Sequence, residues 1–121
     1  MKSYTDLPQS KKLAEILPLE SADMHYVLID TDKNKYSAGL GKYIGILPHY
    51  PCWTLTALFK VIPKNIKDFN VLRIDINEKD FSIWYDKIGY GVNNDLPDIT
   101  MESAVDACYE MIIKLHELKM L

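Results

Sequence analysis

The sequence predicts an α+β fold, in which an antiparallel sheet of three to five strands packs against about three helices in two layers. Residues 71–85 alternate apolar and polar side chains around a polar turn, a pattern typical of a β-hairpin. Residues 100–121 repeat apolar side chains at helical spacing, which predicts an amphipathic helix that covers the sheet. Because the length suits one ordinary domain, we expect a single domain over residues 1–121.

The N-terminal part predicts a short helix, a strand and a turn. Asp6 followed by Gln9 matches a capping box, and Pro18 is expected to end the helix. Residues 24–29 predict a strand, and the continuous apolar run of residues 26–29 predicts that it is well covered. Residues 30–35 are polar throughout and predict a turn.

The next stretch, residues 36–51, is the least determined part of the chain. Gly39, Gly41 and Gly45 weaken a strand, so that residues 36–46 stay open between a strand and a loop. Residues 47–51 contain two prolines and are expected to lack regular structure. The sequence leaves open whether the Tyr50–Pro51 bond is cis.

Two further helices and a short strand are expected. A helix over residues 54–62 has Thr54 as its cap and ends at Pro63. A short third strand follows the hairpin at residues 90–92, and a loop leads to the last helix, with Thr100 as its cap. This helix has an apolar stripe made of Ala104, Val105, Cys108, Met111, Ile112, Leu115 and Leu118.

Composition narrows the class of protein. The chain has 121 residues, a formal net charge of −3 and a single arginine, Arg73, so nucleic acid is not expected as a partner. No apolar run reaches the roughly 20 residues that span a membrane. The two cysteines do not make a disulfide framework, and we expect a cytoplasmic location with both thiols reduced.

Three local patterns resemble ligand sites without completing them. Asp30-x-Asp32-x-Asn34 copies the start of a calcium loop, but Lys35 and Gly41 stand where that loop needs glycine and glutamate. The glycines of residues 39–45 have neither dinucleotide-binding nor P-loop spacing. The three histidines are scattered, so no metal and no cofactor are expected.

The sequence contains candidate residues for catalysis or ligand binding, and others for protein binding. Cys52 precedes a helix and lies near His49, which raises the hypothesis of a small enzyme or ligand-binding domain built on the loop from Gly39 to Cys52. The competing hypothesis is a binding surface, because exposed aromatic side chains often anchor interfaces. Its candidate residues are Tyr43, Tyr50, Trp53, Trp84 and Tyr90.

Several segments together resemble a known group of sequences. They are residues 4–6, 9–15, 20–24 and 51–58, and the string VDACYEMIIKLHEL at residues 105–118. These segments resemble small uncharacterised proteins of gut Bacteroides-type genomes, which are often encoded near phage or mobile elements. The resemblance implies a bacterial, phage-related accessory protein inside the cell, and it assigns no catalytic residue.

The leading hypothesis is therefore a small accessory protein that binds a protein partner or itself through an aromatic-bearing surface. The alternative is the small enzyme or ligand-binding domain that uses Cys52 and His49. The sequence leaves the partner, the substrate and the oligomeric state open.

Overall fold

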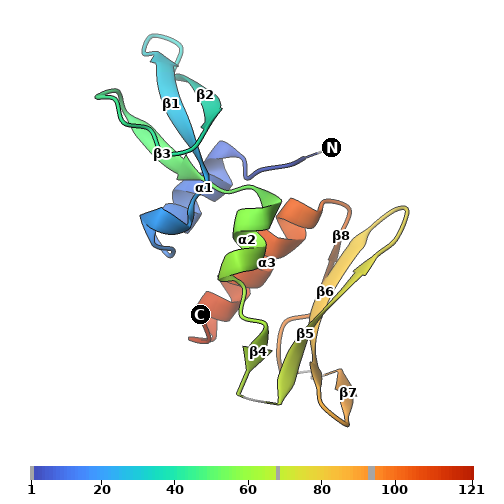
Figure 1. Cartoon of the computed structure of the whole chain (residues 1–121). Helices are drawn as coiled ribbons and strands as arrows, with labels where there is room; N and C mark the ends of the chain where they lie inside the picture. Colours follow the sequence, from blue (N-terminus) through green and yellow to red (C-terminus); the bar gives the residue numbers. More distant parts are fainter. Residues whose placement is uncertain (1, 68, 93–94) are drawn as a thin grey trace. The chain divides into compact units, whose positions relative to one another are not determined.

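The computed structural model describes residues 2–67, 69–92 and 95–121 (Figure 1). In this part of the chain, three α-helices accompany two antiparallel sheets, so the predicted α+β class is confirmed. The chain divides into two compact units. We call Ser3–Ala57 the N-terminal unit, and Leu58–Leu121 with Lys2 the C-terminal unit. Helix α2 runs across the boundary between them.

The N-terminal unit contains one helix, a single 3₁₀ turn and a three-stranded sheet. Its strands lie in the order β2-β1-β3, with both pairs antiparallel. The elements are α1 (Leu7–Ala14), η1 (Leu19–Ser21), β1 (Met24–Asp30), β2 (Lys35–Leu40), β3 (His49–Cys52) and the start of α2 (Leu55–Val61).

The N-terminus of α1 forms as the sequence predicts. Asp6 Oδ1 accepts a hydrogen bond from the Gln9 backbone N–H at 2.9 Å, and Gln9 Oε1 accepts one from the Asp6 N–H at 3.1 Å. This capping box satisfies two amide donors that a helix start leaves free. The helix ends at Ala14, and turn-like bonds continue the chain to Leu17, directly before Pro18.

The prediction that residues 47–51 lack regular structure is wrong. His49–Cys52 forms strand β3, in which Tyr50 lies opposite Tyr26 and Pro51 lies opposite His25. Proline fits because β3 is an edge strand, so only one side needs backbone hydrogen bonds. The described residues contain no cis peptide bond, so the Tyr50–Pro51 bond is trans.

Buried Thr5 ties the elements of the N-terminal unit together. Its backbone N–H donates to the Trp53 carbonyl at 2.9 Å, and its carbonyl accepts from the Tyr26 hydroxyl at 2.8 Å. Its hydroxyl accepts from the Trp53 N–H at 3.2 Å and lies 2.8 Å from the Ser10 hydroxyl. These bonds satisfy polar groups that would otherwise be costly to bury.

The C-terminal unit has a five-stranded sheet and one long helix. Strands β4, β5, β6 and β7 follow one another in the sheet, and β8 also pairs with β6. The elements are β4 (Asn65–Ile66), β5 (Asn70–Ile76), β6 (Phe81–Lys87), β7 (Gly91–Val92), β8 (Ile99–Met101) and α3 (Ala104–Glu117).

The predicted hairpin is confirmed as β5 and β6, with Ile74 opposite Ile83. The expected short third strand is present as β7. Helix α3 packs on β6 and β8, which buries Phe81, Ile83 and Tyr85. On β5, side chains on the same face of the sheet are less covered. Ile76, which lies opposite Phe81, is 76% exposed.

The predicted start of the last helix is wrong. Residues 99–101 form strand β8 on the edge of β6, and the hydroxyl of Thr100 lies 2.7 Å from that of Ser82. The helix cap is Ser103, whose Oγ accepts the Asp106 N–H at 3.2 Å. Threonine suits both a strand and a cap, and here the pairing with β6 decides its role.

The apolar stripe of α3 is largely buried. Val105, Cys108, Met111, Ile112 and Leu115 have no solvent exposure, whereas Leu118 is 46% exposed. Helix α3 therefore contributes side chains to the hydrophobic core along its length, up to its last turn.

Replacing Met111 with alanine should lower the free energy of unfolding by about 2–5 kcal/mol, since a fully buried side chain leaves a cavity. Leu118→Ala on the same helix is the matched control, and its effect should be about 0.5 kcal/mol or less. Urea denaturation of both variants measures the difference. Equal losses would contradict the packing of α3.

Candidate functional site

The two faces of the three-stranded sheet have different surroundings. Tyr26, Tyr50 and Tyr36 share one face with α1, where Lys11 Nζ lies 5.0 Å from the Tyr50 ring centre and 5.9 Å from that of Tyr36. Because side chains alternate along a strand, His25 and His49 lie on the other face. The loop of residues 41–48 lies over these histidines.

Tyr43 fixes that loop on the sheet. Its ring centre lies 5.5 Å from the His25 ring and 4.9 Å from the His49 ring. Its hydroxyl accepts a hydrogen bond from the Leu47 N–H at 3.2 Å. A Cβ atom at Gly45 would lie 2.1 Å from this hydroxyl oxygen, so any other residue there would displace the Tyr43 ring. The ring and the glycine together set the loop conformation.

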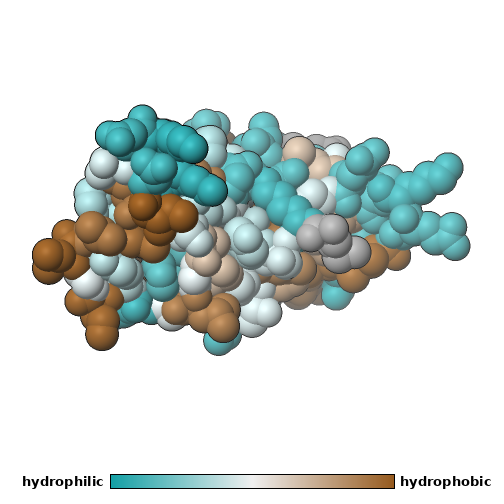
Figure 2. Space-filling model, turned by 90° about the horizontal axis from the view of Figure 1, so that it is seen from above, coloured by the Kyte–Doolittle hydropathy of each residue, from teal (hydrophilic) through white to brown (hydrophobic). Residues whose placement is uncertain are grey.

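The loop exposes large apolar side chains, which we call the loop surface. Its members are Ile44, Ile46 and Leu47, with exposed fractions of 97%, 101% and 47%. Leu40, the last residue of β2, is 84% exposed. Figure 2 shows apolar side chains (brown) gathered at one end of the N-terminal unit. Contiguous exposed apolar groups on a folded protein often mark an interaction site.

The five aromatic residues predicted to bind a partner fall in both units. Tyr43 and Tyr50 are half-buried and lie in the N-terminal unit. Trp84 is half-buried in the C-terminal unit, where its Nε1 donates to Asp86 Oδ1 at 2.9 Å. Tyr90 is 82% exposed, with Lys87 Nζ 5.3 Å from its ring centre.

Trp53 cannot belong to a binding surface, contrary to the prediction. It is fully buried, and its Nε1 donates to Ser21 Oγ at 2.9 Å. Its place just before a helix suggested a loop in the sequence. In the structure, it follows β3 directly and packs into the core of its unit.

The structure separates Cys52 from His49. The two residues are three positions apart on β3, so their side chains lie on opposite faces of the sheet. Cys52 is fully buried, and its Sγ lies 3.5 Å from the Thr5 carbonyl oxygen. Desolvation by burial raises the pKa of its thiol, although bonds with Thr5 and Ser10 oppose the shift. This arrangement favours a structural role for the Cys52 thiol in the core, and not a role as a nucleophile.

Cys108 is also free and buried, in the core of the C-terminal unit. Burial raises the pKa of its thiol to about 12, and the positive charge of Lys64 acts against that shift. Neither thiol therefore has the low pKa of a nucleophile.

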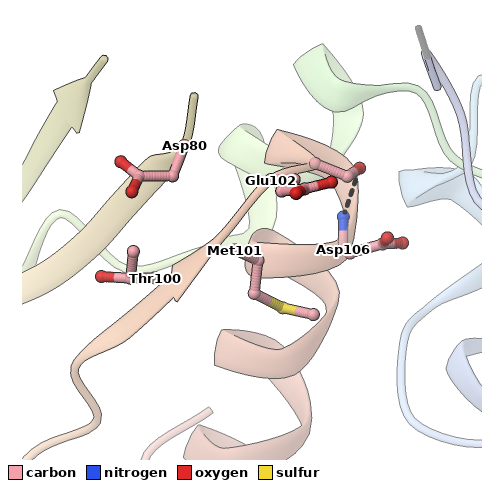
Figure 3. Close-up of a pocket in the computed structure, with 6 residues that line it drawn as sticks. Asp80, Thr100, Met101, Glu102 and Asp106 are labelled. Atoms are coloured by element: carbon pink, nitrogen blue, oxygen red, sulfur yellow. Dashed lines mark hydrogen bonds between the residues drawn. The ribbon is translucent and has the colours of Figure 1, made fainter. Parts of the chain in front are cut away.

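An open pocket of about 570 Å³ in the C-terminal unit carries three carboxylates (Figure 3). Asp80 accepts a hydrogen bond from Asn77 Nδ2 at 3.0 Å, and Asp106 forms an ion pair with Lys2 at 2.6 Å. In the close-up, the Asp80 carboxylate points away from Glu102 and Asp106. Asp80 therefore belongs to the hairpin turn, and Asp106 to the start of α3.

The calcium-like pattern is a plain turn in the structure. Asp30 Oδ1 accepts hydrogen bonds from the N–H groups of Asp32 and Lys33, at 3.1 and 3.2 Å. Within residues 2–67, 69–92 and 95–121, no three acidic, histidine or cysteine side chains come together as a metal would require.

Comparison with models of protein families, with curated proteins and with solved structures found no match to this chain. In the described part of the chain, no helix has both the length and the apolar character needed to cross a membrane.

The sequence did not single out Ile44 and Ile46, which are the most exposed apolar side chains of the loop. One signal was present, since two isoleucines flank Gly45 inside a stretch rich in glycine and proline. This segment lacks the regular apolar spacing of a helix or strand that packs on a core. Large apolar side chains within it are therefore not expected to be buried.

Alkylation of Cys52 by iodoacetamide should be far slower in the folded Cys108→Ala variant than in the same chain unfolded in urea. Burial blocks access and keeps the thiol protonated at pH values where an ordinary cysteine is already ionised. The rate against pH is the measurement. A native rate equal to the unfolded one, with an ordinary or lowered pKa, would restore a reactive Cys52.

Proposed function

We propose that this chain is a small accessory protein that acts by binding protein, and that the loop surface is its contact region. The observation that carries the proposal is the near-complete exposure of Ile44 and Ile46 on a loop whose conformation is fixed. An apolar side chain on a mobile loop can collapse onto its own chain. Tyr43 and Gly45 hold these two outward instead.

The open edge of β2 adds a second contact element. Among the residues that the structure describes, β2 pairs only with β1, and Lys35–Leu40 contains neither proline nor a carboxylate. An uncovered edge strand of this kind presents backbone groups to another strand. The opposite edge, β3, contains Pro51, which lacks the N–H that pairing uses.

A second copy of the chain is the first partner to test. Residues 40–48 contain no carboxylate, and their only full charge is Lys42. An isologous contact brings the same patch from both copies together, so apolar side chains meet apolar side chains. A foreign protein with an apolar face is the other partner that this surface fits.

The setting we propose is the cytoplasm of a bacterium, with a phage or mobile-element origin. Two free, buried thiols suit a reducing compartment. The origin rests on the resemblance of residues 105–118 and the other shared segments. Nucleic acid does not suit a chain with a formal charge of −3 and one arginine.

Replacing both Ile44 and Ile46 with aspartate should abolish self-association, because the double substitution places a charge at both contact positions. Light scattering coupled to size exclusion at two concentrations should show the native chain self-associating as concentration rises, and the double variant staying monomeric. Ile76→Asp is the matched control, since Ile76 is also exposed but lies in the other unit.

Two results together would overturn the proposal. One is a native chain that is monomeric at both concentrations. The other is crosslinking in cells that captures the same proteins with the native chain and with the Ile44→Asp, Ile46→Asp variant. Circular dichroism of the variants confirms that they are folded.

A further inference from the structure

A cavity of about 340 Å³ opens beside Tyr43 in the N-terminal unit, and nothing in the protein-binding proposal uses it. Its volume lies at the lower end of the range for small-molecule sites. Leu19, Met24 and Pro51 form apolar walls, and the ring of Tyr43 adds a flat surface. Such a lining suits a compact ligand with a planar apolar part.

The one full charge among the residues that line this cavity is positive. Lys42, His25 and His49 line it, and no carboxylate does. This is unexpected in a chain with a formal net charge of −3. In the part of the chain that the structure describes, the Lys42 ammonium has neither a hydrogen bond nor an ion pair of its own. It is therefore free to pair with a bound anion.

Both imidazoles are held in a defined orientation. His25 Nδ1 lies 2.9 Å from the Gly41 carbonyl oxygen, and His49 Nδ1 lies 3.0 Å from that of Leu47. A carbonyl oxygen only accepts, so each Nδ1 donates the hydrogen of this bond. The Lys42 ammonium is left as the charged donor beside the two rings.

The ring of His25 also needs the absence of a side chain at Gly39. A Cβ atom at this position would lie 2.7 Å from His25 Nε2. The cross-strand glycine lets the imidazole lie flat on β2, next to the Tyr43 ring. Gly39 therefore leaves the space that the His25 ring occupies.

We propose that the cavity binds a small organic anion, in which a carboxylate or phosphate is joined to a flat apolar ring. The Lys42 ammonium pairs with the anionic group, and the flat ring of the ligand lies against Tyr43 and Pro51. The site is distinct in chemistry from the loop surface, which has no cationic side chain.

Ligand-observed NMR titration of the full chain tests this site with four probes: phenyl phosphate, benzoate, neutral benzyl alcohol and inorganic phosphate. Phenyl phosphate or benzoate should bind at millimolar or lower concentration, and benzyl alcohol and inorganic phosphate should bind at least about tenfold more weakly. The comparison separates the contribution of the charge from that of the ring.

Lys42→Gln should weaken binding of the anionic probe about tenfold, as expected for loss of a charge-assisted contact. Lys33→Gln, in the β1–β2 turn of the same unit, is the matched control and should leave binding unchanged.

Three results would each overturn the assignment: no binding of either organic anion at millimolar concentration, equal affinity for benzyl alcohol, or anion binding that Lys42→Gln leaves unchanged. Inorganic phosphate binding as tightly as phenyl phosphate would also overturn it, since the cavity would then not recognise the ring. Lys42 is exposed, so its substitution does not threaten the fold.

Discussion

Thr5 is the residue on which the N-terminal unit depends, because its three polar groups join segments far apart in the sequence. It connects the N-terminal segment to Trp53 by two hydrogen bonds and to Tyr26 of β1 by a third. Ser10 brings α1 to the same point. Removing the hydroxyl would leave the Trp53 N–H without this acceptor in a buried place, which costs more than the loss of one exposed bond.

This anchoring decides which face of the sheet is free for function. With α1 held at Thr5, it covers the Tyr26 and Tyr50 face of the three strands. The opposite face carries His25 and His49, and the loop of residues 41–48 lies there. The basic cavity and the loop surface therefore both follow from where α1 packs.

Periodic elements could be predicted from sequence, and elements set by pairing could not. The β5–β6 hairpin and α3 have strong periods of two and 3.6, which tertiary contacts reinforce. β3 and β8 are short and contain Pro51 or follow Pro97, so their local signals indicate loops. Their neighbours β1 and β6 make them strands. The division into two compact units was likewise invisible in a chain of single-domain length, and the single-domain expectation stays a prediction.

The candidate site was predicted only in outline. The stretch that contains Tyr43 and His49 could be singled out from its glycines and prolines, but the roles within it depend on which face each side chain occupies. A strand at His49–Cys52 puts His49 and Cys52 on opposite faces, which removes the pairing that a loop would have allowed. Tyr43 supports the loop, while Ile44 beside it is the exposed group.

The magnitudes show what the loop surface can do alone. Burying one isoleucine contributes about 1.5–3 kcal/mol, so the four isoleucines of a two-fold contact contribute roughly 6–12 kcal/mol. Association itself costs about 4–15 kcal/mol in lost freedom. These two quantities nearly balance, so an interface made of these isoleucines alone would be weak. A tighter complex needs a further source of binding energy, and the open edge of β2, which adjoins Leu40, is the element in place to supply it.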